Sequence, residues 1–194
     1  MVKRRTATWL TFILCVWLAL SMACSLGGGS DIPTPPGGRI PVSVEAAERL
    51  RQNFARGLQE AATGGEFRLF VSNEEITSLV ALTLQESGEM PLRDPQIWFT
   101  AGRVYMTGSF SPFWPVRFDS VIVIAALVQN GQIVVQIERA QMGPFPFPQR
   151  VLDTSSRSIN ETLRQMQSDL EVTHLEILEG ELQIAGVRRQ QPGP

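Results

Sequence analysis

The chain has 194 residues, 43% of them hydrophobic, and a formal net charge of −2 at pH 7. This hydrophobic share is ordinary for a chain that folds, and the length fits one domain with an appendage. Because Lys3, Arg4 and Arg5 stand at the extreme N-terminus, the rest of the chain is more acidic than the total, which argues against a nucleic-acid-binding protein.

Residues 1–23 have the layout of a secretory signal, with a basic start, an apolar centre and small residues at the end. The apolar centre is shorter than the roughly 20 residues of a membrane-spanning helix. Cys24 follows directly, and LSMACSLGGGS resembles the lipobox of bacterial lipoproteins, although Ser21 stands where leucine is usual. The resemblance implies lipidation of Cys24 and a domain held at the extracytoplasmic face of the cell membrane. An uncleaved N-terminal membrane anchor is the alternative.

Residues 24–41 are rich in glycine and proline, which is typical of a tether that holds a domain away from the bilayer. We expect a single domain over residues 42–189 and a disordered tail over residues 190–194. The only other cysteine is Cys15, within the signal. The domain therefore has no cysteine for a disulfide, a metal site or a nucleophile.

The domain is predicted to begin with a helix and a strand. Ser43 is a candidate N-cap, and after it apolar residues recur at every fourth position, at Ala46, Leu50, Phe54 and Leu58. This stripe predicts a helix that ends at the stretch Thr63-Gly64-Gly65. The alternating pattern of residues 66–71 then predicts a strand.

A capping box formed by Ser72 and Glu75 predicts that a second helix starts there and runs to about residue 86. Three hairpins follow, with predicted turns at residues 101–102, 130–131 and 179–180. The Asn-Gly pair of the second turn predicts that Val128 pairs with Ile133. A third helix is expected between the second and third hairpins.

The third helix is expected over residues 148–167. With the other elements, it predicts an α+β fold in which a curved antiparallel sheet of about six to seven strands packs against about three helices. The stretch GPFPFPQR at residues 143–150 connects the sheet to this helix. We expect its prolines to prevent strand pairing, Pro148 to occupy the first helical position, and Phe145 and Phe147 to project from a stiff connector.

Four stretches carry a resemblance to a known family, in the order FRLFVSNEEITSLVALTL, PQIWFTAGRVYMTGSF, GQIVVQIERAQMGPFPFPQRVLDTSSRSINETL and EVTHLEILEGELQIAGVR. They resemble membrane-anchored bacterial proteins of the YpmS-like type and, more distantly, LmeA-like proteins and tubular lipid-binding (TULIP-type) domains. The shared pattern includes Gly143, Phe147-Pro148, and Asn160 with Leu163. The resemblance covers about residues 66–188. It implies a curved sheet that wraps a helix and, for the distant relatives, an apolar ligand, but no catalytic residues.

The sequence offers little for catalysis or metal binding. The single histidine, His174, lies on a predicted strand, and no Gly-x-Ser-x-Gly motif accompanies it. Asp119 interrupts an apolar strand, and we expect an ion pair with Arg117 on the same face. We therefore expect no catalytic residue, no metal and no cofactor, and we expect that the domain is not an enzyme.

The run VIVIAALV at residues 121–128 is apolar on both faces of its predicted strand. A strand in an antiparallel sheet usually shows one face to water, so the second face must meet helices, another sheet or a ligand. The stretch FSPFWP at residues 110–115 repeats the aromatic and proline composition of GPFPFP. The residues expected to line an apolar groove, or to contact a membrane surface, are Phe110, Phe113, Trp114, Phe118, Ile122, Ile124, Phe145 and Phe147.

Two functions are consistent with the sequence. The first is a membrane-anchored extracytoplasmic lipoprotein whose domain binds a lipid or another apolar ligand. The second is an envelope structural or interaction protein with a solid core and no ligand. Helices that fill both faces of the sheet would favour the second function, and a hollow beside the sheet would favour the first.

Overall fold

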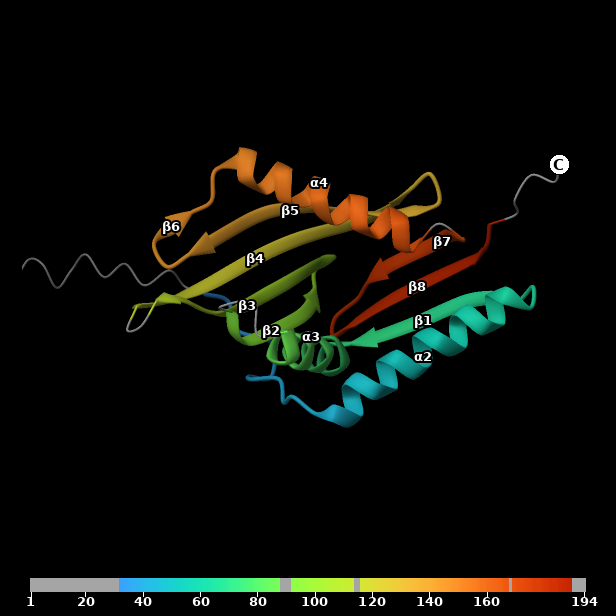
Figure 1. The fold of residues 1–194 in the computed structure, drawn as a ribbon, viewed down its shortest axis with the longest axis horizontal. Helices are drawn as coiled ribbons and strands as arrows, with labels where there is room; N and C mark the ends of the chain where they lie inside the picture. Colours follow the sequence, from blue (N-terminus) through green and yellow to red (C-terminus); the bar gives the residue numbers. More distant parts are fainter. Residues whose placement is uncertain (1–31, 88–91, 114–115, 168, 190–194) are drawn as a thin grey trace, which may run out of the picture. The chain divides into compact units, whose positions relative to one another are not determined.

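The computed structural model describes residues 32–87, 92–113, 116–167 and 169–189 (Figure 1). The predicted signal, Cys15, Cys24 and Trp114 lie outside them, as do residues 190–194. The described residues form three helices and eight strands, so the prediction of an α+β fold is confirmed. The strands form two antiparallel sheets rather than the single sheet that was expected.

The smaller sheet has three strands in the order β1-β8-β7, with bounds β1 (Glu66–Ser72), β8 (Glu181–Arg188) and β7 (Leu170–Ile177). The larger sheet has five strands in sequence order. Their bounds are β2 (Leu92–Thr100), β3 (Arg103–Phe113), β4 (Val116–Gln129), β5 (Gln132–Met142) and β6 (Phe145–Pro146).

The three predicted hairpins are confirmed, and the predicted pair Val128–Ile133 is in register. Asn130 and Gly131 have φ of 53° and 70°, while Ala101 and Gly102 have φ of 49° and 72°. Two successive positive φ values are the geometry of a tight turn whose twist matches the flanking strands.

The helix α2 (Val44–Ala62) begins as predicted, because Ser43 Oγ accepts a hydrogen bond from Ala46 N at 3.0 Å. The predicted apolar stripe holds only in part, since Phe54 and Leu58 are 41% and 42% exposed. A spacing of four residues rotates by about 40° at each step, so the stripe leaves the buried face. Further along, the small residues Gly57 and Ala61 take the buried positions.

The helix α3 (Asn73–Ser87) starts at the predicted capping box and then runs along the outer edge of β2. Ser72 N donates to Glu75 Oε2 at 3.0 Å, and Glu75 N donates to Ser72 Oγ at 3.3 Å. Thr77 Oγ1 accepts from the amide of Ile97 at 3.0 Å and donates to its carbonyl at 2.9 Å. The edge of β2 is thereby paired with side chains instead of a strand.

The helix α4 (Gln149–Met166) closes the opposite edge of the larger sheet in the same way. Asn160 accepts from Val135 N at 2.8 Å and donates to Val135 O at 2.9 Å, and Ser156 Oγ accepts from Ile137 N at 2.9 Å. Four residues of helix and two residues of strand both span about 6–7 Å, so these contacts stay in register. Neither α3 nor α4 packs extensively on the central strands β3 and β4.

The connector GPFPFPQR differs from expectation in two respects. Its prolines do not prevent pairing, because Phe145 and Pro146 form the short strand β6 beside β5, and Phe147 N donates to Ala140 O at 2.9 Å. A two-residue edge strand needs no donor from proline, since the phenylalanine amides supply the bonds. Pro148 is the N-cap of α4 rather than its first residue, with φ −61° and ψ 145°.

Backbone hydrogen bonds tie the two sheets together at two turns. Gly180 N, in the β7–β8 turn, donates to Phe99 O of β2 at 3.0 Å. Val172 N of β7 donates to Gly131 O, in the β4–β5 turn, at 2.8 Å. The sheets are therefore joined through their turns.

Many of the buried apolar side chains of the described residues gather in two clusters. The larger one lies between α2, β1 and the end of β2 and consists of Leu50, Ala61, Phe67, Leu69, Val71 and Phe99. The smaller one lies between β5 and α4 and consists of Ile137, Ala140 and Leu152. Half-buried apolar side chains lie between these clusters.

Candidate ligand-binding groove

Strand register places six of the eight predicted groove residues on one face of the larger sheet, which we call the inner face. Phe110 of β3 lies opposite Phe118 of β4, and alternate residues of β4 then bring Ile122 and Ile124 to the same face. Phe145 and Phe147 of the connector continue this face beside Met142 and Ala140 of β5. The side chain of Phe113 and all of Trp114 lie outside the described residues.

Most apolar residues on the inner face are only half-buried, although they lie in the middle of a sheet. Ile137 and Ala140, beneath α4, are buried at 6% and 7% exposure. Along the central strands the burial is incomplete because none of the three described helices packs extensively on them. The half-buried apolar side chains on the inner face of β3, β4 and β5 are Val104, Met106, Phe110, Phe118, Ile122, Ile124, Ala126, Val128, Ile133, Val135 and Met142.

The smaller sheet presents a second set of half-buried apolar side chains. Residues of β7 and β8 on the same face as Phe67 and Leu69 lie beyond the cover of α2, which packs mainly on β1. They are Leu175, Ile177, Leu182 and Ile184. The opposite face of this sheet carries Arg68, His174 and Gln183, as expected for a solvated face.

The helix α4 contributes a third apolar surface. Leu163 is half-buried, while Ile159 and Met166 are 38% and 72% exposed. These three residues and Leu152 lie on one side of the helix, and the polar Ser156 and Asn160 that bond to β5 lie next to them. One side of α4 therefore pairs with the edge of β5. The adjoining side carries apolar residues that are not used in this pairing.

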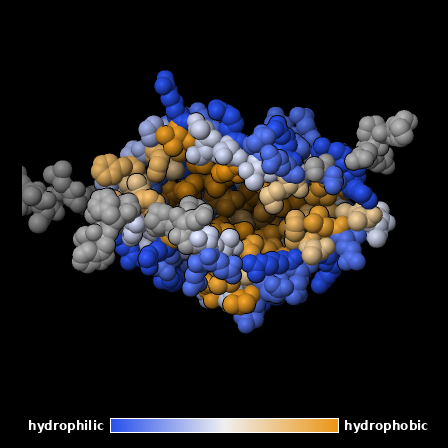
Figure 2. Space-filling model, viewed as in Figure 1, coloured by the Kyte–Doolittle hydropathy of each residue, from blue (hydrophilic) through white to orange (hydrophobic). Residues whose placement is uncertain are grey.

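A hollow lies where these apolar surfaces meet. Figure 2 shows a depression lined by hydrophobic residues, with hydrophilic ones above and below it, over the middle of β3, β4, β7 and β8 and below α4 in the view of Figure 1. We call it the apolar groove. Contiguous exposed apolar surface beyond a few hundred Å² is unusual in a monomer and marks a binding surface.

Two further depressions have mixed, largely polar linings and are separate from the apolar groove. One of about 830 Å³ lies at the end of α2 and the outer ends of β7 and β8, where Asp169, Glu171, Arg188 and Arg189 line it. The other, of about 240 Å³, lies beside α2 near Arg56 and Arg68. Both lack the continuous apolar lining that a lipid chain would need.

Aromatic residues gather at one end of the inner face, which we call the aromatic end. The rings of Phe118 and Phe145 meet edge to face, with centroids 6.4 Å apart. Gly143, at φ +55°, permits this approach, because a Cβ there would lie 3.0 Å from Cδ1 of Phe118. Phe145 is 61% exposed and Phe147 is 39% exposed, so this end projects into solvent.

The outer face of the larger sheet is less open. Trp98 is 2% exposed and its ring stacks on Tyr105 at 5.5 Å, whereas Leu127 of β4 is 51% exposed. The expectation that both faces of β4 would be covered holds only in part on this face, since Val121 is buried and Leu127 is exposed. The hollow lies on the inner face.

The polar residues singled out from the sequence do not assemble a reaction centre within the described residues. His174 is exposed on β7, with Nε2 3.5 Å from Glu176 Oε2. Arg117 does not pair with Asp119 as expected, because its guanidinium donates to Ser109 Oγ at 2.7 Å and lies 3.5 Å from Asp94. The described part of the chain holds no group of three potential metal ligands and no helix long and apolar enough to cross a bilayer.

Comparison of the chain with protein-family models, curated proteins and solved structures finds no match. The geometry nevertheless gives distinct roles to residues of the Asn-x-x-Leu pattern, since Asn160 pairs with the edge of β5 and Leu163 lies on the apolar side of α4. The sequence analysis missed the contribution of β7 and β8 to the apolar groove. Their alternating apolar residues could have indicated it, namely Leu175, Ile177, Leu182 and Ile184.

Proposed function

We propose that this chain is a membrane-anchored extracytoplasmic protein whose domain binds a lipid or another apolar chain in the apolar groove, without catalysing a reaction. The observation that carries the proposal is the hydrophobic hollow between the two buried clusters (Figure 2). An acyl chain in that position would curve along the inner face of the larger sheet, below α4.

The energetics of burial favour an apolar ligand. Fully burying a large aliphatic side chain is worth about 1.5–3 kcal/mol, and the half-buried residues of the groove forgo part of this. A bound chain would recover it and would contribute about 0.8 kcal/mol for each of its own buried methylenes. Because the groove offers few polar groups, it would select for shape and hydrophobicity rather than for a particular head group.

The alternative function, an interaction protein with a solid core, receives less support. It requires helices or side chains that fill the inner face, whereas α3 and α4 lie along the sheet edges. The hollow in Figure 2 favours the ligand-binding proposal.

Two neighbouring alanines of β4 provide a matched test. Ala126 faces the groove and Ala125 faces the opposite side of the sheet, and both are half-buried. We expect Ala126→Phe to fill the groove and to weaken the binding of the fluorescent fatty acid 11-(dansylamino)undecanoic acid about tenfold, or roughly 1.4 kcal/mol. Ala125→Phe should leave the affinity within about twofold of the wild type.

Circular dichroism would establish that both alanine variants fold. Equal affinity of Ala126→Phe and the wild type for the fatty acid would contradict the proposal. An equal loss of fatty-acid affinity in the two variants would point to a general effect of the larger side chain. This result would also count against a groove on the inner face.

Anchoring through Cys24 is the second part of the proposal. The signal-like stretch before this residue and the Gly/Pro-rich stretch after it support a lipidated, tethered form. A labelled fatty acid should enter the wild type and not Cys24→Ala when the proteins are produced in a bacterium. Equal labelling of the two would exclude Cys24 as the attachment point.

A further inference from the structure

The segment before α2 is fixed to the β2 edge of the larger sheet. Ile40 N donates to Gln96 Oε1 at 2.7 Å, and Gln96 Nε2 donates to Ile40 O at 3.3 Å, both in buried surroundings. Gln96 follows the irregularity in β2 that separates it from Arg93. These bonds attach the segment before α2 to the start of β2.

Two ion pairs extend this attachment toward the aromatic residues. Arg39 lies 3.0 Å from Asp94 Oδ1, and Arg117 lies 3.5 Å from Asp94 Oδ2. Arg117 immediately precedes Phe118, and Leu92, two residues before Asp94, lies opposite Phe110. The chain thus enters the domain at the end of the larger sheet where Phe110 and Phe118 lie, at the edge formed by β2.

We infer that the aromatic end docks on the phospholipid bilayer, so that this end of the apolar groove opens toward the membrane. The inference rests on the proposed function, because it gives the groove its source of ligand. It commits to a bilayer surface as the partner of the exposed side chains of Phe145 and Phe147.

The length of the chain before the domain is compatible with this orientation. Fifteen residues, 25–39, separate Cys24 from Ile40, and a fully extended chain over these sixteen Cα–Cα steps spans at most about 55 Å. The glycines and prolines of this stretch allow a shorter reach. A chain anchored at Cys24 would therefore be long enough to let the aromatic end reach the bilayer.

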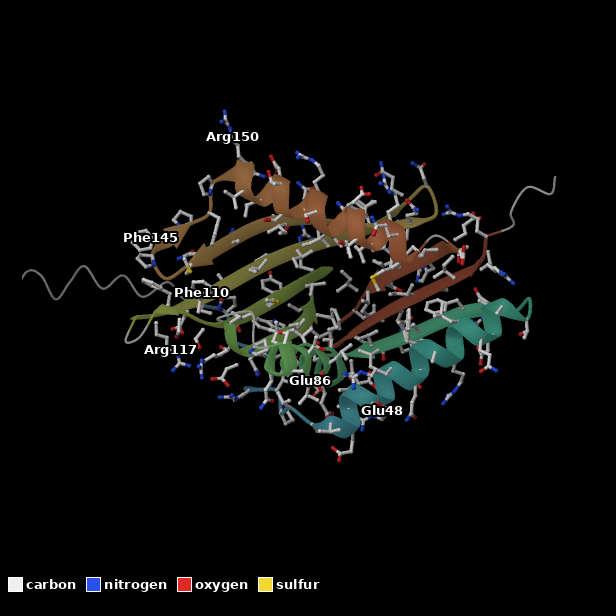
Figure 3. The ribbon with its side chains drawn as sticks, in the orientation of Figure 1. Glu48, Glu86, Phe110, Arg117, Phe145 and Arg150 are labelled. Carbon is white, nitrogen blue, oxygen red and sulfur yellow. The ribbon has the colours of Figure 1, made fainter. Side chains whose placement is uncertain are left out.

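The chemistry of the aromatic end fits a lipid interface. Phe145 and Phe147 stand between prolines and lose little conformational entropy when they insert, and Val151 nearby is 42% exposed. Figure 3 shows Arg117 and Arg150 on either side of Phe110 and Phe145, whereas Glu48 and Glu86 lie on the side of α2 and α3. Aromatic residues are at home at the membrane–water interface, and arginine pairs with phosphate groups.

This orientation gives the ligand a short path. A lipid that leaves the bilayer at the aromatic end would pass Phe118 and Phe145 and reach the inner face at Ile122 without crossing bulk water. The aromatic pair would then stand at the mouth of the groove.

The test uses the full-length lipidated protein with Cys15→Ala, reconstituted in vesicles of phosphatidylglycerol and phosphatidylcholine. A cysteine introduced by Phe145→Cys carries an NBD label, and doxyl-labelled phosphatidylcholine is the quencher. Phe70→Cys is the matched control, because Phe70 is 52% exposed on the solvated face of β1. Protein without an added cysteine gives the background labelling, and Phe147→Cys provides a second label position at the aromatic end.

We expect the doxyl lipid to quench the label at residue 145 at least twofold more than the label at residue 70. Equal quenching at residues 70, 145 and 147 would overturn the docking inference. Native mass spectrometry of the same preparations separates the two proposals. Bound lipid with an unquenched label overturns docking alone, whereas a quenched label without bound lipid supports docking and contradicts the ligand-binding proposal.

Discussion

Gly102 and Gly131 hold the same position in two hairpin turns, but only one of them touches a second element. Their φ values are 72° and 70°. A Cβ on Gly102 would meet open space, whereas a Cβ on Gly131 would lie 2.8 Å from Glu171 Cγ at the start of β7. Substituting Gly102 therefore tests the backbone strain of a turn alone, whereas substituting Gly131 tests the same strain together with the contact between the two sheets.

We expect Gly102→Ala to lower the free energy of unfolding by about 1 kcal/mol, which is the cost of a left-handed backbone for an ordinary residue. Gly131→Ala should lower the free energy of unfolding by about 1 kcal/mol more than Gly102→Ala does, because Glu171 must move while Val172 stays bonded to the turn. Urea unfolding measures both changes. The added substitution Glu171→Ala should remove the difference, and equal costs of the two glycine substitutions would contradict this account of the contact.

The two helices that flank the larger sheet set the position of the groove at the scale of elements. They pair with the outer edges of β2 and β5 through side chains, so neither of them covers the central strands. Asn160 is the most exacting of these contacts because it uses both its donor and its acceptor on Val135.

We expect Asn160→Ala to lower the free energy of unfolding by about 1–3 kcal/mol, because Val135 would lose partners for its amide and its carbonyl. The amide of Val135 should exchange faster with deuterium. Thr154→Ala is the control, since that exposed hydroxyl bonds only within α4 and its loss should cost less than about 0.5 kcal/mol. Unchanged exchange at Val135 in Asn160→Ala would contradict the edge-pairing role.

Local elements were predictable from the sequence where short-range chemistry decides them. Ser72 and Glu75 start α3, and Asn130-Gly131 sets the register of β4 and β5. The pairing of β1 with β8 was not predictable, because no local signal encodes a partner more than a hundred residues away. The edge positions of α3 and α4 were missed because an apolar stripe indicates burial and does not distinguish a sheet face from a sheet edge.

For the candidate site too, the sequence predicted local features but not contacts between distant segments. Strand alternation brought Phe110, Phe118, Ile122 and Ile124 to one face because the side-chain period of a strand is two. The ion pair of Arg117 with Asp119 was wrong because the fold brings Asp94 within reach, at a positive φ beside the irregularity of β2. Contacts of this kind depend on how distant strands meet.

At the scale of the whole domain, the main feature is a core divided into two clusters with an apolar hollow between them. The backbone bonds from Gly180 to Phe99 and from Val172 to Gly131 join the sheets at their turns. A solid domain would place helices or large side chains over β3 and β4. We propose that an apolar ligand occupies that space.

Native mass spectrometry of the domain, produced from residue 32 in a bacterium and purified without detergent, tests this claim most directly. We predict a species heavier than the polypeptide by the mass of a lipid or fatty acid, which collisional activation releases before the chain unfolds. A folded domain that shows only the mass of its polypeptide, before and after exposure to lipid vesicles, would contradict the claim.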